Sequence, residues 1–221
     1  MNKVTTVKEA VQRLKSGDTV LIGGFLQSGA PETILQGVLN YSDAKDLTIV
    51  SNDTGTSEMT TIKIMQQGRV KKVIASYIGA NPVTGQMLMD NPESVELSPQ
   101  GTLAERIRCG GAGIAAFYTP VGVGTIVEKG KEKRTFNGVD YLLETNIRGN
   151  IAFIKATIAD KEGNCFLKGS TKNFNAIMAR AADYVVVEAE QIVEVGELDH
   201  ELVTIPGLFI DAIVQSEGQN G

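Results

Sequence analysis

Short apolar segments alternate with amphipathic segments along most of this 221-residue chain, and no other feature limits its possible folds as strongly. Residues 19–22 and 47–50 are apolar runs, and between them Ile34, Leu35 and Val38 share one face of a helix that begins near Pro31. Strands joined through a helix in this way pair in parallel. We therefore expect an α/β fold, with an open, mostly parallel, twisted sheet that carries helices on both faces. Further strands are expected at 73–77, 95–97, 151–158 and 184–187, and a further helix at 174–182.

Local signals add detail to this prediction. Thr6 with Glu9, and Thr102 with Glu105, have the spacing of a capping box, which marks the first turn of a helix. The pair Asn137-Gly138 favours a tight turn and predicts a small antiparallel hairpin within 136–143. Because no internal repeat or linker divides the chain, we expect a single domain over residues 1–215, followed by a polar tail over 216–221.

Composition excludes several classes of partner and cofactor. The formal net charge of −5 makes nucleic acid and anionic membrane improbable partners. No apolar run reaches the ~20 residues that a membrane helix needs, and residues 1–17 lack the apolar core of a signal peptide, so we expect a cytoplasmic protein. Cys109 and Cys165 have no metal-ligand spacing and are expected to be reduced thiols. His200, the single histidine, is read as a surface residue, and we expect no metal site.

The glycine-rich segment 23–31 follows the first expected strand directly and is the best candidate for a binding site. Glycines at this position let backbone N–H groups approach a ligand, and the next helix presents its N-terminus, which favours negative charge. Two familiar phosphate motifs are absent. Ala30 and Pro31 stand where a Walker A loop needs Lys and Ser or Thr, and the Gly-x-Gly-x-x-Gly spacing of dinucleotide-binding folds does not occur here. A purely structural strand-to-helix turn is the alternative reading of the segment alone.

Several blocks together resemble the alpha subunit of family I, or 3-oxoacid-type, coenzyme A-transferases. The first block, 18–31, contains Gly-Gly-Phe and Gly-x-Pro in the family order. The matching blocks cover nearly the whole chain, in order and at matching spacing. They are 18–31, 51–54, 71–79, 98–113, 117–125, 180–182 and 195–198. Residues 52–54 and 81–85 are most similar to the bacterial acetate/butyrate–acetoacetate type.

This resemblance implies both a fold and a reaction. The fold is that of CoA-transferases and ribose-phosphate isomerases. In the reaction, a glutamate carboxylate attacks an acyl-CoA and becomes a glutamyl-CoA thioester, from which an acceptor acid takes the CoA. The family glutamate lies in a Ser-Glu-Asn-Gly motif on the beta subunit. Neither Ser57-Glu58 nor Ser216-Glu217 continues in that way, and Glu58 is read as a residue at the start of a helix. The resemblance thus implies a beta-subunit partner that supplies the nucleophile, acyl-CoA as substrate, and no tightly bound cofactor.

The same resemblance assigns candidate site residues. The CoA- or acyl-binding loop is assigned to Gly23, Gly24, Phe25, Leu26, Gln27, Ser28 and Gly29. Gln100 is the best catalytic candidate, because an amide N–H₂ beside the carboxylate pocket can bind a substrate oxygen or an oxyanion. Its alternative is a polar turn residue. Asn52 is a weaker candidate, since Ser-Asn-Asp is also favourable turn chemistry.

The sequence does not decide the roles of four other charged residues or the identity of the substrate. Arg106 and Arg108 either face CoA phosphates or belong to a charged helix surface, and Glu188 and Glu190 are read as an exposed or partner-facing strand edge. Acetate, butyrate or acetoacetate are the expected acids. Two other readings of the scaffold are a sugar-phosphate isomerase- or deaminase-like enzyme and a non-catalytic ligand-binding module.

Overall fold

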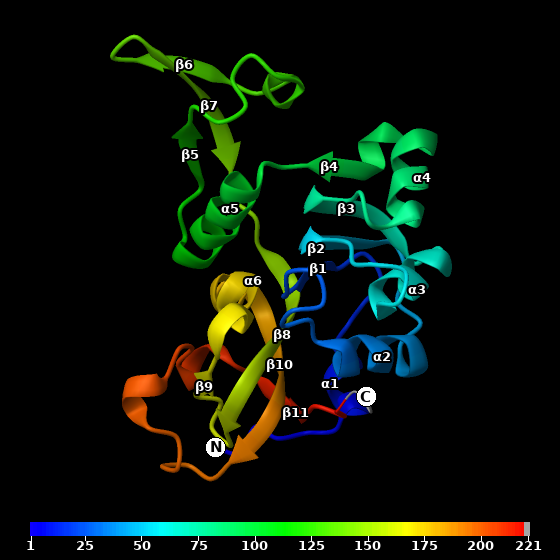
Figure 1. Cartoon of the computed structure of the whole chain (residues 1–221), viewed down its shortest axis with the longest axis vertical. Helices are drawn as coiled ribbons and strands as arrows, with labels where there is room; N and C mark the ends of the chain where they lie inside the picture. The colour runs from blue at the N-terminus through cyan, green and yellow to red at the C-terminus, as the bar shows by residue number, and fades with distance from the viewer. Residues whose placement is uncertain (219–221) are drawn as a thin grey trace.

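A large parallel sheet forms the centre of the molecule in a computed structural model that describes residues 1–218 (Figure 1). Its strand order is β11-β10-β8-β1-β2-β3-β4, and β9 pairs with β8 in antiparallel orientation. The strands are β1 (Thr19–Ile22), β2 (Leu47–Asp53), β3 (Val70–Tyr77), β4 (Val95–Leu97), β8 (Gly149–Asp160), β9 (Cys165–Phe166), β10 (Ala182–Val193) and β11 (Ala212–Gln215). The predicted open, mostly parallel sheet is confirmed.

A small antiparallel sheet lies at one end of the molecule, at the top of Figure 1. Its order is β5-β7-β6, and the strands are β5 (Ala116–Thr119), β6 (Lys133–Phe136) and β7 (Val139–Thr145). Asn137 and Gly138 have φ angles of 51° and 80°, as a two-residue turn with positive φ at both positions requires. The predicted hairpin is confirmed, with β5 as an additional third strand.

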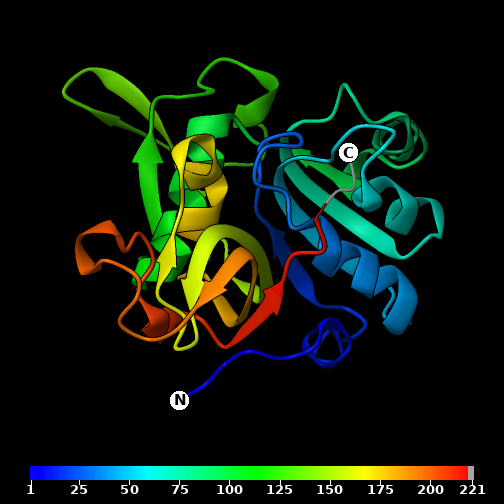
Figure 2. The same ribbon diagram turned by 60° about the horizontal axis from the view of Figure 1, so that its bottom comes forward.

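Helices cover both faces of the large sheet. They are α1 (Val7–Val11), α2 (Glu32–Tyr41), α3 (Thr60–Gln66), α4 (Pro82–Asp90), α5 (Gln100–Ala112) and α6 (Asn173–Met178). Short 3₁₀ helices are Pro92–Ser94, Ile126–Glu128, Gly169–Lys172, His200–Leu202 and Gly207–Phe209. Side chains from α1, α2 and α3 pack with one face of the sheet, and side chains from α5 and α6 pack with the other. Figure 2 shows the same division, with α5 and α6 on one side and α2 and α3 on the other.

The chain order places a switch point beside β1. From β1 the chain adds β2, β3 and β4 on one side, then returns to the other side of β1 with β8, β10 and β11. Both neighbours of β1 are parallel to it, with Ile22 paired to Ser51 on β2 and to Phe153 on β8. Ligands of open α/β sheets bind at the carboxyl ends of the strands at such a point. The glycine segment that follows β1 therefore lies where a ligand site is expected.

Several local predictions need correction. The capping box of Thr6 and Glu9 is present, but that of Thr102 and Glu105 is not. Helix α5 begins three residues earlier, with Pro99 rather than Thr102 as its N-cap, so Thr102 is buried in its first turn and its hydroxyl has no hydrogen-bond partner within residues 1–218. The expected helix 174–182 ends at residue 178. The predicted tail lies partly outside the described residues, and the division into one domain and a tail stays a prediction.

Candidate active site

The loop between β1 and α2 makes a tight turn at its tip. Phe25 and Ser28 exchange two backbone hydrogen bonds, of 3.0 and 3.1 Å, across Leu26 and Gln27. Leu26 has a φ of 51°, which is uncommon for a residue with a branched side chain. Backbone outliers of this kind persist only where the surroundings hold them, and they cluster at functional sites. The apolar side chains of Phe25 and Leu26 are exposed.

The carboxylate of Asp53, at the end of β2, holds this tip. Its Oδ2 accepts the N–H of Leu26 at 2.8 Å and the side-chain N–H of Asn52 at 2.8 Å, and its Oδ1 accepts the N–H of Gly55 at 2.9 Å. Asp53 is buried, so these donors replace its hydration. Asp53 has no role assigned from the sequence beyond its place in a turn motif. Its position at the carboxyl end of a strand, opposite the loop, was the available signal.

The two amide candidates, Asn52 and Gln100, lie together. Nε2 of Gln100 donates to Oδ1 of Asn52 at 2.7 Å, and the hydroxyl of Ser76 donates to the same oxygen at 2.9 Å. Because a carboxylate only accepts, Asp53 directs the Asn52 N–H₂ toward itself and leaves Oδ1 of Asn52 for Gln100. Gln100 is therefore held by its N–H₂ group, and one hydrogen of that group remains for a ligand. Gln100 itself is exposed, at the first residue of α5.

The loop also offers backbone donors. Within residues 1–218, no protein group accepts a hydrogen bond from the N–H of Gly24, Gln27 or Gly29. Backbone N–H groups near a ligand site need a partner, and a substrate oxygen can supply one. The arrangement thus combines backbone donors from the loop with a side-chain donor from α5 at the same edge of the sheet.

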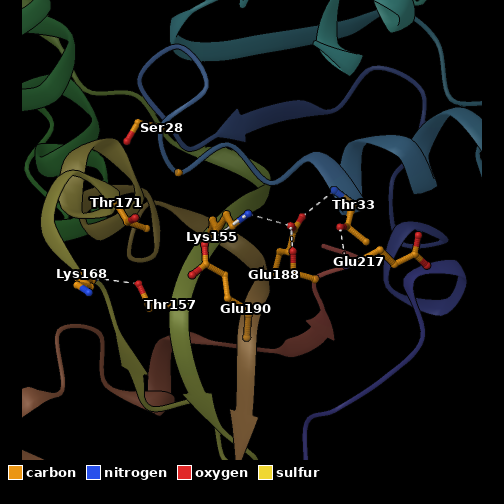
Figure 3. Close-up of polar contacts among 12 residues, drawn as sticks. Ser28, Thr33, Lys155, Thr157, Lys168, Thr171, Glu188, Glu190 and Glu217 are labelled. Atoms are coloured by element: carbon orange, nitrogen blue, oxygen red, sulfur yellow. Dashed lines mark hydrogen bonds and ion pairs between the residues drawn. The ribbon is translucent and has the colours of Figure 1, made fainter. Parts of the chain in front are cut away.

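Helix α2 does not offer its N-terminus to a ligand, because Glu188 of β10 occupies it (Figure 3). Oε2 of Glu188 accepts the N–H groups of Thr33 and Ile34 at 2.8 and 3.3 Å, and Oε1 accepts the hydroxyl of Ser216 at 2.6 Å and lies 3.4 Å from Nζ of Lys155. Glu188 is only 1% exposed, so its reading as an exposed strand edge is wrong. A buried carboxylate stabilises a helix N-terminus in the same way as a bound anion.

A cavity of about 260 Å³ lies beside this ion pair, between the loop and α3. Its lining includes Gln27, Glu58, Lys155 and Glu217. Glu58 lies just before α3, which begins at Thr60. Lys155, near Glu188 and Glu190, is already paired, and carboxylates outnumber it here. The cavity therefore favours no phosphate.

The two arginines on α5 are both paired with glutamates. Arg106 is 7% exposed; its Nη1 lies 2.6 Å from Oε1 of Glu96, and its Nε donates to the backbone oxygen of Thr145 at 2.8 Å. Burial raises the pKa of Glu96, but the hydrogen bonds and charges of Arg106 and Lys72 outweigh this effect and leave the pKa below its usual value. Arg108 pairs with Glu105 on the surface. Arg106 thus ties α5 to β4 and β7.

The remaining titratable candidates have no place in the site. Cys109 and Cys165 are free and buried, and burial raises the pKa of Cys165 to about 12. His200 is exposed in a 3₁₀ helix. Residues 1–218 hold no group of three or more His, Cys, Asp or Glu side chains arranged for a metal ion. Within the same residues, every helix is too short or too polar to cross a membrane.

Solved structures with the same fold include two CoA-transferases. The acyl-CoA transferase of Escherichia coli O157:H7, solved as a thioester complex with CoA, superposes with a TM-score of 0.90 at 22% identity. The match covers 99% of this chain and 48% of that one. Glutaconate coenzyme A-transferase of Acidaminococcus fermentans matches with a TM-score of 0.83 at 22% identity, over 97% of this chain and 75% of that one. The fold is thus that of the CoA-transferase class.

Sequence comparison establishes the family. The coenzyme A transferase family model matches residues 4–216, and the chain belongs to this family. The acetoacetyl-CoA:acetate/butyrate CoA transferase alpha subunit of Clostridium acetobutylicum is 49% identical, over 91% of this chain and 92% of the relative. The acetate CoA-transferase subunit alpha of Escherichia coli is 42% identical, over 97% of each. The predicted family and enzyme class are confirmed, which removes the sugar-phosphate enzyme and the non-catalytic module as readings.

Proposed function

We propose that this chain is the alpha subunit of a short-chain acyl-CoA:carboxylate CoA-transferase that uses acetate, butyrate or acetoacetate and turns over only with its beta subunit. The names of the two relatives above support the substrate class. The observation that carries the proposal is the site itself, where Asp53 joins the loop tip at Leu26 to the Gln100–Asn52 amide pair. Acyl-CoA is a substrate in this proposal, and no cofactor is tightly bound.

The loop and the amide pair supply hydrogen-bond donors, and the one carboxylate bonded to them is not a ready nucleophile. Asp53, the carboxylate beside the amide pair, is 8% exposed and accepts three hydrogen bonds, so most of its lone pairs are engaged. A nucleophilic carboxylate needs an open approach to the thioester carbon. Glu58, in the lining of the cavity, does not lie in the Ser-Glu-Asn-Gly motif of the family nucleophile. We therefore assign the nucleophilic glutamate to the beta subunit, approaching from the carboxyl edge of the sheet.

The proposed chemistry proceeds by acyl and thiol exchange. The partner glutamate attacks the thioester carbon of the acyl-CoA, the C–S bond breaks, and CoA thiolate leaves a mixed anhydride. The thiolate then attacks the glutamyl carbonyl, which releases the free acid and forms a glutamyl-CoA thioester. An acceptor carboxylate repeats the two steps in reverse order. Each step develops negative charge on a carbonyl oxygen, which the N–H₂ of Gln100 and the free loop N–H groups can stabilise.

Transfer activity is the direct test of this function. Butyryl-CoA would be paired with acetate and with acetoacetate, using this chain alone, the beta chain alone and the mixture. Activity in the mixture only is the expected result, since each chain holds part of the site. Turnover by this chain alone would show that a carboxylate read here as structural is the nucleophile. A mixture without activity on any of these acids would refute the proposed substrate class.

Gln100→Ala tests the proposed donor. In the assembled enzyme, kcat should fall by ~10²–10³-fold, the usual cost of removing one oxyanion donor. Gln86→Ala is the matched control, because Gln86 is exposed on α4 and bonds only Asp90. If both variants retained the wild-type kcat, Gln100 would be the polar turn residue of the alternative reading.

We also place this activity in the cytoplasm. Two free cysteines, both buried, suit a compartment that keeps thiols reduced.

A further inference from the structure

Asn175, on α6, contacts the glycine loop from the side opposite Asp53. Its side chain is completely buried. Oδ1 accepts the N–H of Lys155 on β8 at 3.0 Å, and Nδ2 donates to the backbone oxygens of Gly29 and Thr171, each at 3.0 Å. One amide thus joins the loop, β8 and the 3₁₀ turn before α6. Figure 3 labels Ser28 of the loop, Lys155 of β8 and Thr171 of this 3₁₀ turn, one residue from each of the three segments.

The space at the start of the loop is also shaped by Asn175. A Cβ atom on Gly23 would lie 1.8 Å from Oδ1 and 2.7 Å from Cγ of Asn175, far inside van der Waals contact. The φ of Gly23 is outside the left-handed region, so an alanine is conformationally allowed there. Glycine is therefore required at this position by the amide, and Gly23 and Asn175 form one packing unit.

Contacts from α6 also orient the loop's N–H groups. Nδ2 of Asn173 donates to the backbone oxygen of Ser28 at 3.0 Å. A trans peptide directs its C=O and N–H in opposite directions, so this bond turns the N–H of Gly29 away from α6. The N–H of Gly29 is one of the loop donors without an acceptor within residues 1–218. The amides of Asn173 and Asn175 thus control the direction in which the loop presents its donors.

We propose that Asn175, supported by Asn173, is a positioning residue that fixes the glycine loop for acyl transfer. This inference rests on the proposed function. Asn175 touches no substrate and acts through Gly23 and Gly29, while Asp53 holds the tip of the same loop. A misplacement of the donors by about 1 Å can cost ~10²-fold in rate without loss of binding. The role predicts a lower kcat at nearly constant KM.

A double-mutant cycle separates positioning from general support. Gly23→Ala alone should lower kcat by ~10²-fold, because the new methyl displaces the loop. Asn175→Ala should lower it by ~10-fold or more, with acyl-CoA KM nearly unchanged. In the double variant the nearest remaining atom of Asn175 is Cα, 3.5 Å from the methyl, so kcat should equal or exceed that of Gly23→Ala. Losses that simply multiply would overturn the inference.

Two substitutions serve as matched controls. Gly85→Ala adds a methyl that meets no atom within 4 Å, and Asn40→Ala removes an exposed amide that accepts from Gln36. Both should keep the wild-type kcat. Wild-type enzyme with its beta chain must turn over in the same assay; if it does not, the proposed function fails, irrespective of Asn175.

Hydrogen–deuterium exchange gives a readout that does not depend on activity. In Asn175→Ala the amides of Leu26 and Ser28, which are hydrogen-bonded in the loop, should exchange faster, while those of β3 should not change. Unchanged exchange of the loop amides would refute the proposal that Asn175 holds the loop. Faster exchange with an unchanged kcat would show that Asn175 stabilises the loop without affecting catalysis, and would also overturn the positioning role.

Discussion

At the scale of single residues, one carboxylate connects the two parts of the site. Asp53 accepts from the loop tip at Leu26 and from Asn52, which in turn orients Gln100. Asp53 also accepts the N–H of Gly55, so three N–H donors, on Leu26, Asn52 and Gly55, depend on a side chain that only accepts. A buried network of this kind is stable when every member is satisfied, and costly when one is not.

Asp53→Asn should disturb both parts at once. The new N–H₂ group would face at least one of the three donors, leaving a buried N–H unsatisfied at a cost of about 1–3 kcal/mol in unfolding free energy. Urea denaturation measures this loss, and kcat of the assembled enzyme should fall with it. The exposed Asp90→Asn, which affects a single surface hydrogen bond, is the control. An Asp53→Asn enzyme with wild-type stability and rate would show that the network is not required.

At the scale of elements, the sequence predicted what local patterns determine. The Asn137-Gly138 turn and the first capping box depend on adjacent residues, and both are present. The reading of Glu58 as a residue at the start of a helix agrees with α3, which begins at Thr60, although Thr60–Gln66 is rich in β-branched residues, which are typical of strands. The second capping box is absent because α5 begins at Gln100, with Pro99 as its N-cap, which places Thr102 inside the first turn.

The site could be predicted only in part, because its remaining contacts join distant segments. Asn52 and Gln100 were found through a resemblance, and their mutual hydrogen bond spans 48 residues. The burial of Glu188 depends on the N-terminus of α2, 155 residues away, and the role of Asn175 depends on the loop at Gly29, 146 residues away. No local pattern contains this information, since polar residues in a strand or helix usually indicate a surface.

Arg106 tests how the small sheet is joined to the large one. Arg106→Met should lower the unfolding free energy by about 3 kcal/mol, the lower end for removing one partner of a buried ion pair, because Glu96 is 33% exposed. Arg108→Met, on the same helix, removes a surface pair and should cost less than ~1 kcal/mol. Equal costs would mean that Arg106 contributes only as a surface charge.

The same ion pair has a pH dependence with a definite sign. The folded-state pKa of Glu96 lies below its ordinary value of 4.5, so the pair contributes stability above that pH and loses it as the pH falls through the lower folded value. Arg106→Met removes this contribution. The difference in unfolding free energy between wild type and Arg106→Met should therefore shrink in acid, and a constant difference between pH 7 and pH 3 would contradict the assignment.

At the scale of the whole molecule, one sheet connects every part that the site uses. Strand β8 borders β1 at the switch point, contributes Lys155 beside Asn175, and carries side chains into both hydrophobic clusters. Phe153 packs in one cluster and Ala152 and Ile154 in the other. Loss of packing on one face should therefore affect the other through the same strand. The small sheet depends on this body through α5 and the buried pairs of Arg106.

Phe153→Ala tests whether the chain unfolds as one unit, as the single domain over 1–215 predicts. Removal of the buried phenyl ring should lower the unfolding free energy by about 3–5 kcal/mol. Far-UV circular dichroism follows the whole fold, and fluorescence of the tyrosines, with no Trp present, includes Tyr118 and Tyr141 of the small sheet. Both signals should give one coincident urea transition, shifted equally by the substitution. A tyrosine transition that keeps its wild-type midpoint would show that the small sheet unfolds independently, and the donors of the site would then rest on the large sheet alone.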